Sequence, residues 1–168
     1  IHATSSSLPT VIAGAQIWDA TPSELLLAYI IGVETSARIG LISGGKFQKA
    51  GFHPTGLIGI FGSTLAASKI AKLSIPQIVS AQGIALSMAS GSMQFLEDGS
   101  WTKRIHPGLA AQSALNACSL AKENFKGPSD AYSGRYGLFP LFLERTDVDP
   151  IEILTSLGET WELLNVAI

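Results

Sequence analysis

Proline recurs at the beginning of segments that favour helix formation, and this pattern limits the folds open to the chain more than any other feature. Thr-Pro-Ser-Glu at 21–24 and Ser-Ile-Pro-Gln at 74–77 are both capping boxes. The first residue of such a box caps the helix and the last returns the hydrogen bond, while proline fits the first turn because its missing N–H is not needed there. No regular strand alternation precedes residue 160. The sequence therefore predicts an all-α fold, a helical-bundle domain.

The predicted helices are joined by glycine-rich connections. We expect Gly40 to end the second helix and 161–168, a short apolar run, to begin a strand. Segment 91–106 is expected to be irregular with some helical character, and 145–149 comes nearest to a linker. The predicted helices span residues 8–19, 21–39, 54–72, 74–90, 107–124 and 149–158.

Small residues share one face of the predicted helix 54–72, namely Gly56, Gly59, Gly62 and Ala66. A phosphate-binding loop needs a preceding strand and a Gly-Lys-Ser/Thr ending, and this segment has neither. We therefore interpret the small residues as positions where another helix packs closely.

The composition points to a surface that other protein covers. The chain has 168 residues, enough for one domain with a core, but only 14% are charged, against roughly 25% in typical soluble domains. Hydrophobic residues make up 46% and the mean hydropathy is +0.33. A net charge of −2 provides no electrostatic footprint for nucleic acid. We expect a second domain or a partner subunit to cover part of the apolar surface.

Two segments without charge, 50–68 and 73–96, are interrupted by proline and polar residues, so no membrane span is expected. The single cysteine, Cys118, excludes an internal disulfide framework and is expected to be a small buried side chain. No basic region precedes an apolar run at the start of the chain, and a cytoplasmic location is expected.

Two histidines are each followed by proline at a predicted helix start, His53 and His106, and Lys103 and Arg104 precede the second. Helix N-termini and cations attract anions, and a positive dipole end lowers the pKa of a nearby histidine. The pattern favours a small polyanion with neutral imidazoles as proton-transfer groups. The alternatives are a helix-capping or core histidine at 53 and a solvated loop at 103–104. Metal binding is not expected, because the histidines lack ligand spacing.

The same segments resemble a known family. Phe-His-Pro-Thr-Gly at 52–56, the long motif at 94–108 and Gly-Arg-Tyr-Gly at 134–137 closely resemble the MmgE/PrpD family. That family includes 2-methylcitrate dehydratase, cis-aconitate decarboxylase and iminodisuccinate epimerase. The resemblance implies a large helical domain with a smaller α+β lid domain, a homodimer, and action on small polycarboxylates without a metal or iron–sulfur cofactor.

The resemblance also implies roles for particular residues. The family's active-site histidine in Phe-His-Pro falls on His53, its active-site lysine in Trp-Thr-Lys-Arg on Lys103, and its earlier histidine on His2, although Ala3 replaces the usual proline. We expect these three to be catalytic. Arg104, His106 and Thr55 are expected to bind the substrate.

Two family segments are missing from the 168 residues, an upstream Asp-Asp-Thr-His segment and the lysine-proline segment that opens the lid. We therefore expect residues 1–160 to be part of the helical domain of a larger enzyme, residues 161–168 to begin the connection to an absent lid, and the isolated chain to be inactive. The expected activity is that of a lyase resembling 2-methylcitrate dehydratase. Decarboxylation or epimerisation on the same scaffold, and a non-catalytic helical interaction module, remain alternatives.

Overall fold

The computed structural model describes residues 1–143 and 149–166, and every regular element in these ranges is helical. The all-α prediction is confirmed. The long helices are α1 (Ala3–Trp18), α2 (Pro22–Ser43), α5 (Gly59–Ile70), α6 (Ile75–Met88) and α8 (His106–Lys122). The short elements are α3 (Lys46–Lys49), α4 (Pro54–Leu57), α7 (Phe95–Asp98), α9 (Leu138–Leu143) and the 3₁₀ helices η1 (Trp101–Arg104), η2 (Pro150–Leu154) and η3 (Glu162–Asn165).

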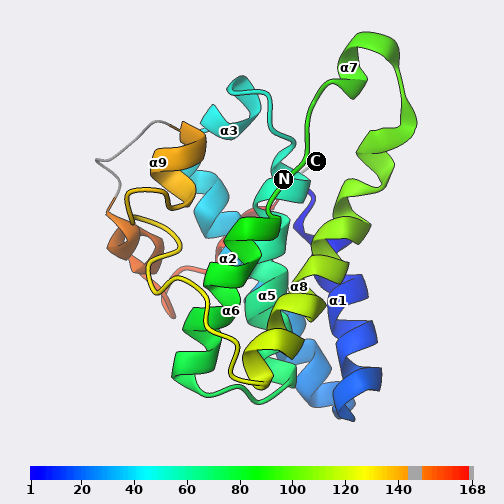
Figure 1. The fold of residues 1–168 in the computed structure, drawn as a ribbon, viewed down its shortest axis with the longest axis vertical. Helices are drawn as coiled ribbons and strands as arrows, with labels where there is room; N and C mark the ends of the chain where they lie inside the picture. Colours follow the sequence, from blue (N-terminus) through cyan, green and yellow to red (C-terminus); the bar gives the residue numbers. More distant parts are fainter. Residues whose placement is uncertain (144–148, 167–168) are drawn as a thin grey trace.

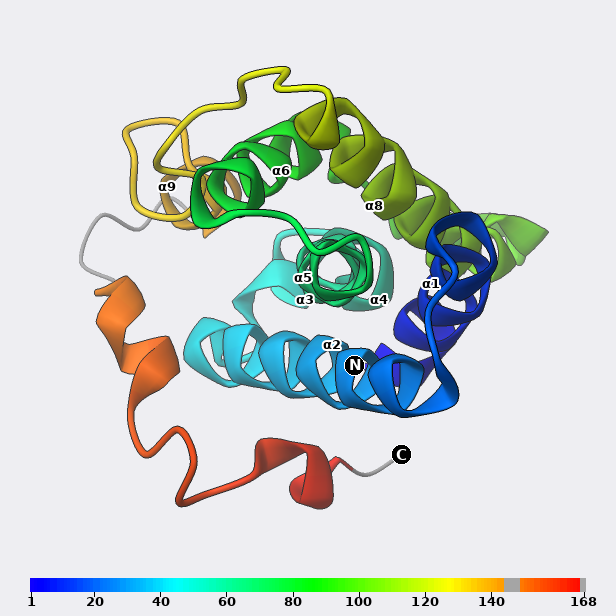
Figure 2. The same ribbon diagram turned by 90° about the horizontal axis from the view of Figure 1, so that it is seen from below.

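Helix α5 lies at the centre of the bundle, enclosed by α1, α2, α6 and α8 (Figure 2). Two of the predicted small residues explain how closely its neighbours approach. A Cβ atom on Gly59 would lie 2.6 Å from Ser6 Oγ of α1, and one on Gly62 would overlap Ser36 Oγ and the Gly32 carbonyl oxygen of α2. The predicted close packing on this face is confirmed.

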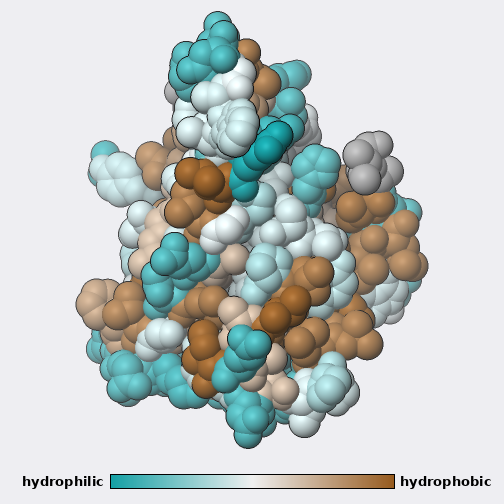
Figure 3. Space-filling view, turned by 90° about the vertical axis from the view of Figure 1, so that its right-hand side faces the viewer, coloured by the Kyte–Doolittle hydropathy of each residue, from teal (hydrophilic) through white to brown (hydrophobic). Residues whose placement is uncertain are grey.

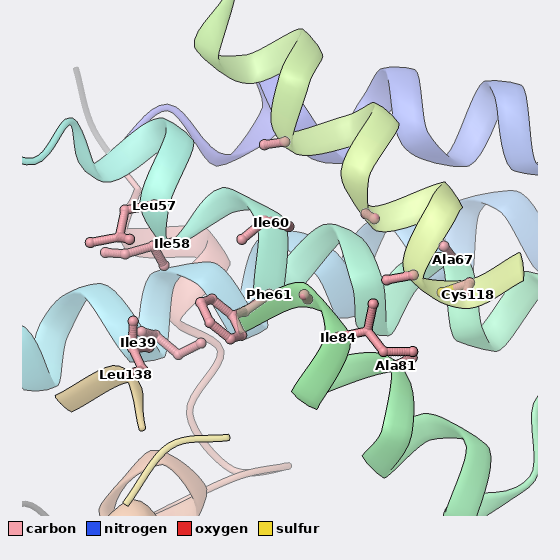
Figure 4. Close-up of a cluster of buried hydrophobic side chains, with 14 of the residues drawn as sticks. Ile39, Leu57, Ile58, Ile60, Phe61, Ala67, Ala81, Ile84, Cys118 and Leu138 are labelled. Carbon is pink, nitrogen blue, oxygen red and sulfur yellow. The ribbon is translucent and has the colours of Figure 1, made fainter. Parts of the chain in front are cut away.

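The main hydrophobic core extends along both halves of α5. Phe61 is fully buried and lies near Ile39 of α2 and Leu138 of α9 (Figure 4). Burial of each such side chain stabilises the fold by about 1.5–3 kcal/mol. Cys118 of α8 is buried in the same cluster, as expected, and burial raises the pKa of its thiol to about 12.

Several helix boundaries differ from the sequence-based expectation. Gly40 does not end α2, which continues to Ser43 and ends at Gly44, whose φ of +55° suits a residue without a side chain. The predicted helix 54–72 is interrupted at Ile58, which separates α4 from α5. Helix α1 begins at Ala3 rather than at residue 8. The predicted helix 149–158 is a 3₁₀ helix that ends at Leu154, and its Asp149 cap accepts a hydrogen bond from Ile151 N at 2.9 Å.

The predicted strand at 161–168 is wrong for the residues described, because η3 occupies 162–165. The backbone N–H groups of Glu162 and Leu163 donate to the Glu34 carboxylate at 3.2 and 2.8 Å. A side chain, rather than a neighbouring strand, thus satisfies this backbone. Residues 167–168, and 145–148 of the suggested linker, lie outside the described residues.

A buried ion pair on α2 holds the C-terminal segment. Arg38 donates to Glu34 at 2.5 Å and to the carbonyl oxygens of Ile153, Thr155 and Thr160 at 3.0, 2.7 and 2.6 Å. The segment from η2 to η3 runs along the outside of α2 (Figure 2). By length and composition α2 would also suffice to cross a membrane, and 44% of its most apolar window is buried inside the bundle. Buried core helices of soluble proteins have the same features, so this is weak evidence for a span.

Residues 94–105, which we call the arm, project from the same end of the bundle as the start of the chain (Figure 1). Phe95 is the one buried residue of the arm. The side of the molecule formed by α1 carries apolar areas among hydrophilic ones (Figure 3). On α1 itself Leu8, Ile12 and Ile17 are 40, 46 and 57% exposed.

Candidate active site

His53 precedes α4, and a backbone hydrogen bond fixes its position. Its N–H donates to the Gly91 carbonyl oxygen at 2.7 Å, and Met93 N donates to Gly51 O at 2.9 Å. These bonds flank an isolated antiparallel bridge between Phe52 and Ser92. The base of the arm is therefore fixed against the backbone that carries His53.

His106 opens α8 and meets His53 directly. The two Nδ1 atoms lie 3.0 Å apart, and each histidine is only 8% exposed. The Phe95 ring packs edge-on against both imidazoles, with centroid distances of 5.7 Å to His53 and 5.9 Å to His106. Gly91, with φ of +129°, lies over the pair, and a Cβ there would be 3.6 Å from His106 Nδ1.

Four of the six predicted site residues line one cavity of about 220 Å³: His2, His53, Thr55 and Lys103. They come from the start of α1, the start of α4 and the arm. The His2 N–H also donates to Thr55 Oγ1 at 3.4 Å, which links the first two. The volume suits a small acid rather than a larger ligand. The remaining lining residues are Ile1, Gln48, Pro54, Met93, Phe95 and Leu96.

Arg104 and His106 are not part of this lining. The Arg104 guanidinium lies over the Trp101 ring, 5.0 Å from its centroid, on the exposed side of the arm. Successive residues of a 3₁₀ helix point about 120° apart, so Lys103 and Arg104 of η1 face different directions. His106 instead lines a neighbouring cavity of about 440 Å³. A third cavity, of about 400 Å³, shares Pro54 with the site cavity. Its lining contains no Lys, Arg or His.

Burial keeps both imidazoles neutral near pH 7. It lowers the pKa of His53 to about 4, and positive charge on His106, Lys103 and His2 acts in the same direction. Burial also lowers the pKa of His106. The direction agrees with the sequence-based argument, although desolvation, rather than a helix dipole, is the main cause. A neutral imidazole beside an ammonium group can exchange a proton with a bound polyanion.

Sequence reasoning missed Phe95 and Gly91 as parts of the site. Phe95 belongs to the long motif at 94–108, but nothing in its spacing indicates that it covers two histidines. Among the described residues, no group of three or more His, Cys, Asp or Glu side chains is arranged to hold a metal ion.

Comparison with known proteins identifies the family. The model of the MmgE/PrpD N-terminal domain matches residues 1–151. A cis-aconitate decarboxylase-like protein of Aspergillus oryzae is 29% identical over all of this chain and 37% of its own length. A cis-aconitate decarboxylase of Aspergillus terreus is 27% identical, over all of this chain and 36% of its own length. The human cis-aconitate decarboxylase is 31% identical over 75% of this chain and 27% of its own length.

The chain thus spans little more than a third of the length of the relatives that it matches from end to end. The family match, by contrast, includes both histidine-proline segments and the whole arm. The resemblance noted from the motifs is confirmed, and the chain belongs to the MmgE/PrpD family.

Proposed function

We propose that this chain supplies part of the active site of a carboxy-lyase that removes CO₂ from a small unsaturated polycarboxylate, with cis-aconitate as the first candidate. The main support for this proposal is that the Lys103 ammonium group and the neutral imidazole of His53 line the same cavity. The relatives named for cis-aconitate decarboxylation favour this reaction over the 2-methylcitrate dehydration that we expected first.

The chemistry follows from charge. Loss of CO₂ breaks one carbon–carbon bond and leaves its electron pair on the substrate, where a proton must form the new C–H bond. Lys103 neutralises part of the substrate's negative charge, and Thr55 and His2, which line the same cavity, offer hydrogen bonds. A bound polyanion raises the pKa of His53, since opposite charge favours imidazolium. Binding therefore promotes protonation of the imidazole that supplies the required proton.

The assay uses the intact gene product with cis-aconitate, 2-methylcitrate and citrate, and measures CO₂ release and product mass. We expect CO₂ and one decarboxylated product from cis-aconitate, and kcat/KM reduced by about 100-fold or more in His53→Ala. Lys126→Ala, a replacement of an exposed residue after α8, is the control. Water loss from 2-methylcitrate without CO₂ release from cis-aconitate would overturn the proposal.

The proposal includes a homodimer. Its support is the low charge content together with the exposed apolar side chains Leu8, Ile12 and Ile17 of α1. Light scattering of the intact gene product tests it, and a monomer at micromolar concentration would contradict it.

A further inference from the structure

His53 and His106 touch each other but open onto different cavities. His53 lines the site cavity with Lys103, whereas His106 lines the neighbouring cavity with Ser90, Ser100 and Thr102. Phe95 lines both and packs against both imidazoles. The two rings therefore form a direct connection between the two cavities.

The contact between the Nδ1 atoms defines two proton arrangements. At 3.0 Å one Nδ1 donates and the other accepts, so a single proton lies between the neutral rings. When His106 donates, its Nε2 is free to accept a proton and His53 carries its own proton on Nε2. When His53 donates, the positions are reversed. Because His53 Nδ1 is occupied in both cases, Nε2 is the nitrogen that meets a substrate.

We propose that His53 and His106 form a proton relay that carries a proton from the second cavity to the carbon that loses CO₂. The proposal rests on the proposed function. A proton from water bonds to His106 Nε2, the Nδ1 proton of His106 moves to His53 Nδ1, and the Nε2 proton of His53 forms the C–H bond. The reaction consumes one proton, and the relay delivers one.

The relay resets after the product leaves. His53 Nε2 then takes a proton from water in the open site cavity, the proton between the rings returns to His106, and His106 Nε2 releases one to the second cavity. While substrate fills the site cavity, His53 Nε2 faces carbon and the Nδ1 side is the route left for a proton. These three transfers return both rings to their starting form, so the full cycle contains six proton transfers.

The charges around the pair fit this direction of transfer. Lys103 and His2 face His53 and oppose a proton there until a polyanion enters. Among the described residues that line the second cavity, His106 is the only ionisable side chain, and serine and threonine hydroxyls surround it. Hydroxyl groups suit a cavity that holds water.

Two replacements of His106 in the intact gene product separate a relay from a purely structural role. His106→Gln retains a hydrogen-bonding group for His53 Nδ1 but cannot pass a proton on. We expect kcat to fall about 30-fold or more while KM changes less than about 3-fold. Leu109→Ala, which alters the same cavity one turn later on α8, is the matched control and should stay within about 2-fold.

Chemical rescue gives a readout that a structural role would not move. In His106→Ala, added imidazole enters the second cavity, and the restored rate should follow the imidazolium fraction as the pH changes. Activity of His106→Gln within about 3-fold of wild type, or no rescue by imidazole, overturns the relay while the proposed function stands. A wild-type protein that releases no CO₂ from any of the three acids overturns the proposed function and the relay with it.

Discussion

Glu34 and Arg38 form a buried ion pair one turn apart on α2, and together they hold the backbone of residues 153–163. The arginine donates to three carbonyl oxygens and the glutamate accepts from two N–H groups, so each contact with the segment joins a charge to its backbone. The pair connects the last described part of the chain to the bundle.

Removal of one charge from this pair should destabilise the fold strongly. Glu34→Gln leaves the Arg38 guanidinium buried without a counter-charge, and we expect the free energy of unfolding to fall by about 3 kcal/mol. Cleavage within 153–163 during limited proteolysis should be faster. Glu24→Gln on the same helix is the control: it removes an exposed ion pair with Lys72 but retains a capping side chain, and should have a much smaller effect. Equal losses in the two variants would contradict this account.

Two glycines in helices should respond oppositely to alanine. Gly62→Ala forces a methyl group into Ser36 and the Gly32 backbone, and we expect a loss of about 2–4 kcal/mol, or failure to fold. Gly108→Ala meets no atom within 4 Å on α8 and should gain about 0.5–1 kcal/mol. Urea denaturation measures both, and a neutral Gly62→Ala would show that α2 and α5 do not pack as closely as described.

Lys103 and Arg104 are adjacent, yet only Lys103 should matter for catalysis. Lys103→Ala removes the ammonium group from the cavity and should reduce kcat/KM by about 100-fold. Arg104→Ala removes a cation that lies over Trp101 and should change kcat/KM less than about 3-fold. Steady-state kinetics of the intact gene product test both, and a large effect at Arg104 would restore its expected role in substrate binding.

Protonation of His53 should contribute to acid denaturation. Its pKa is about 4 in the fold and about 6.5 in the unfolded chain, so the unfolded state binds more protons between these values. Stability is therefore complete above about pH 6.5 and falls as the pH decreases towards 4. We expect His53→Gln to weaken this pH dependence by about 1 kcal/mol between pH 7 and pH 4. Urea titrations at the two pH values would refute this if wild type and variant changed equally.

Local signals in the sequence predicted where helices form, but not which distant residues contact them. The Thr21 capping box forms as expected, with Thr21 N donating to Glu24 Oε2 at 2.9 Å, because both partners lie within one turn. The strand expected after residue 160 failed because a distant carboxylate, Glu34, binds its backbone. No local pattern reports a partner 128 residues away.

The candidate site likewise has features that the motifs indicated and features that depend on how the helices pack. His2, His53, Thr55 and Lys103 share a cavity, as the motifs implied. The approach of His106 to His53 depends on how α8 packs beside α4, and the direction of Arg104 depends on the 3₁₀ turn at η1. Neither is encoded within a single short segment. Geometry therefore assigns His106 to a neighbouring cavity where the sequence suggested contact with the substrate.

The two walls of the site cavity offer different scope for directed evolution. His53 precedes α4, which leads into α5, and four helices enclose α5, so libraries built there would return mostly unfolded protein. Lys103 stands on the arm, which inserts a single side chain, Phe95, into the bundle. Leu96 of the arm is exposed and also lines the cavity, so replacements there should change which acid is preferred while the imidazole stays in place.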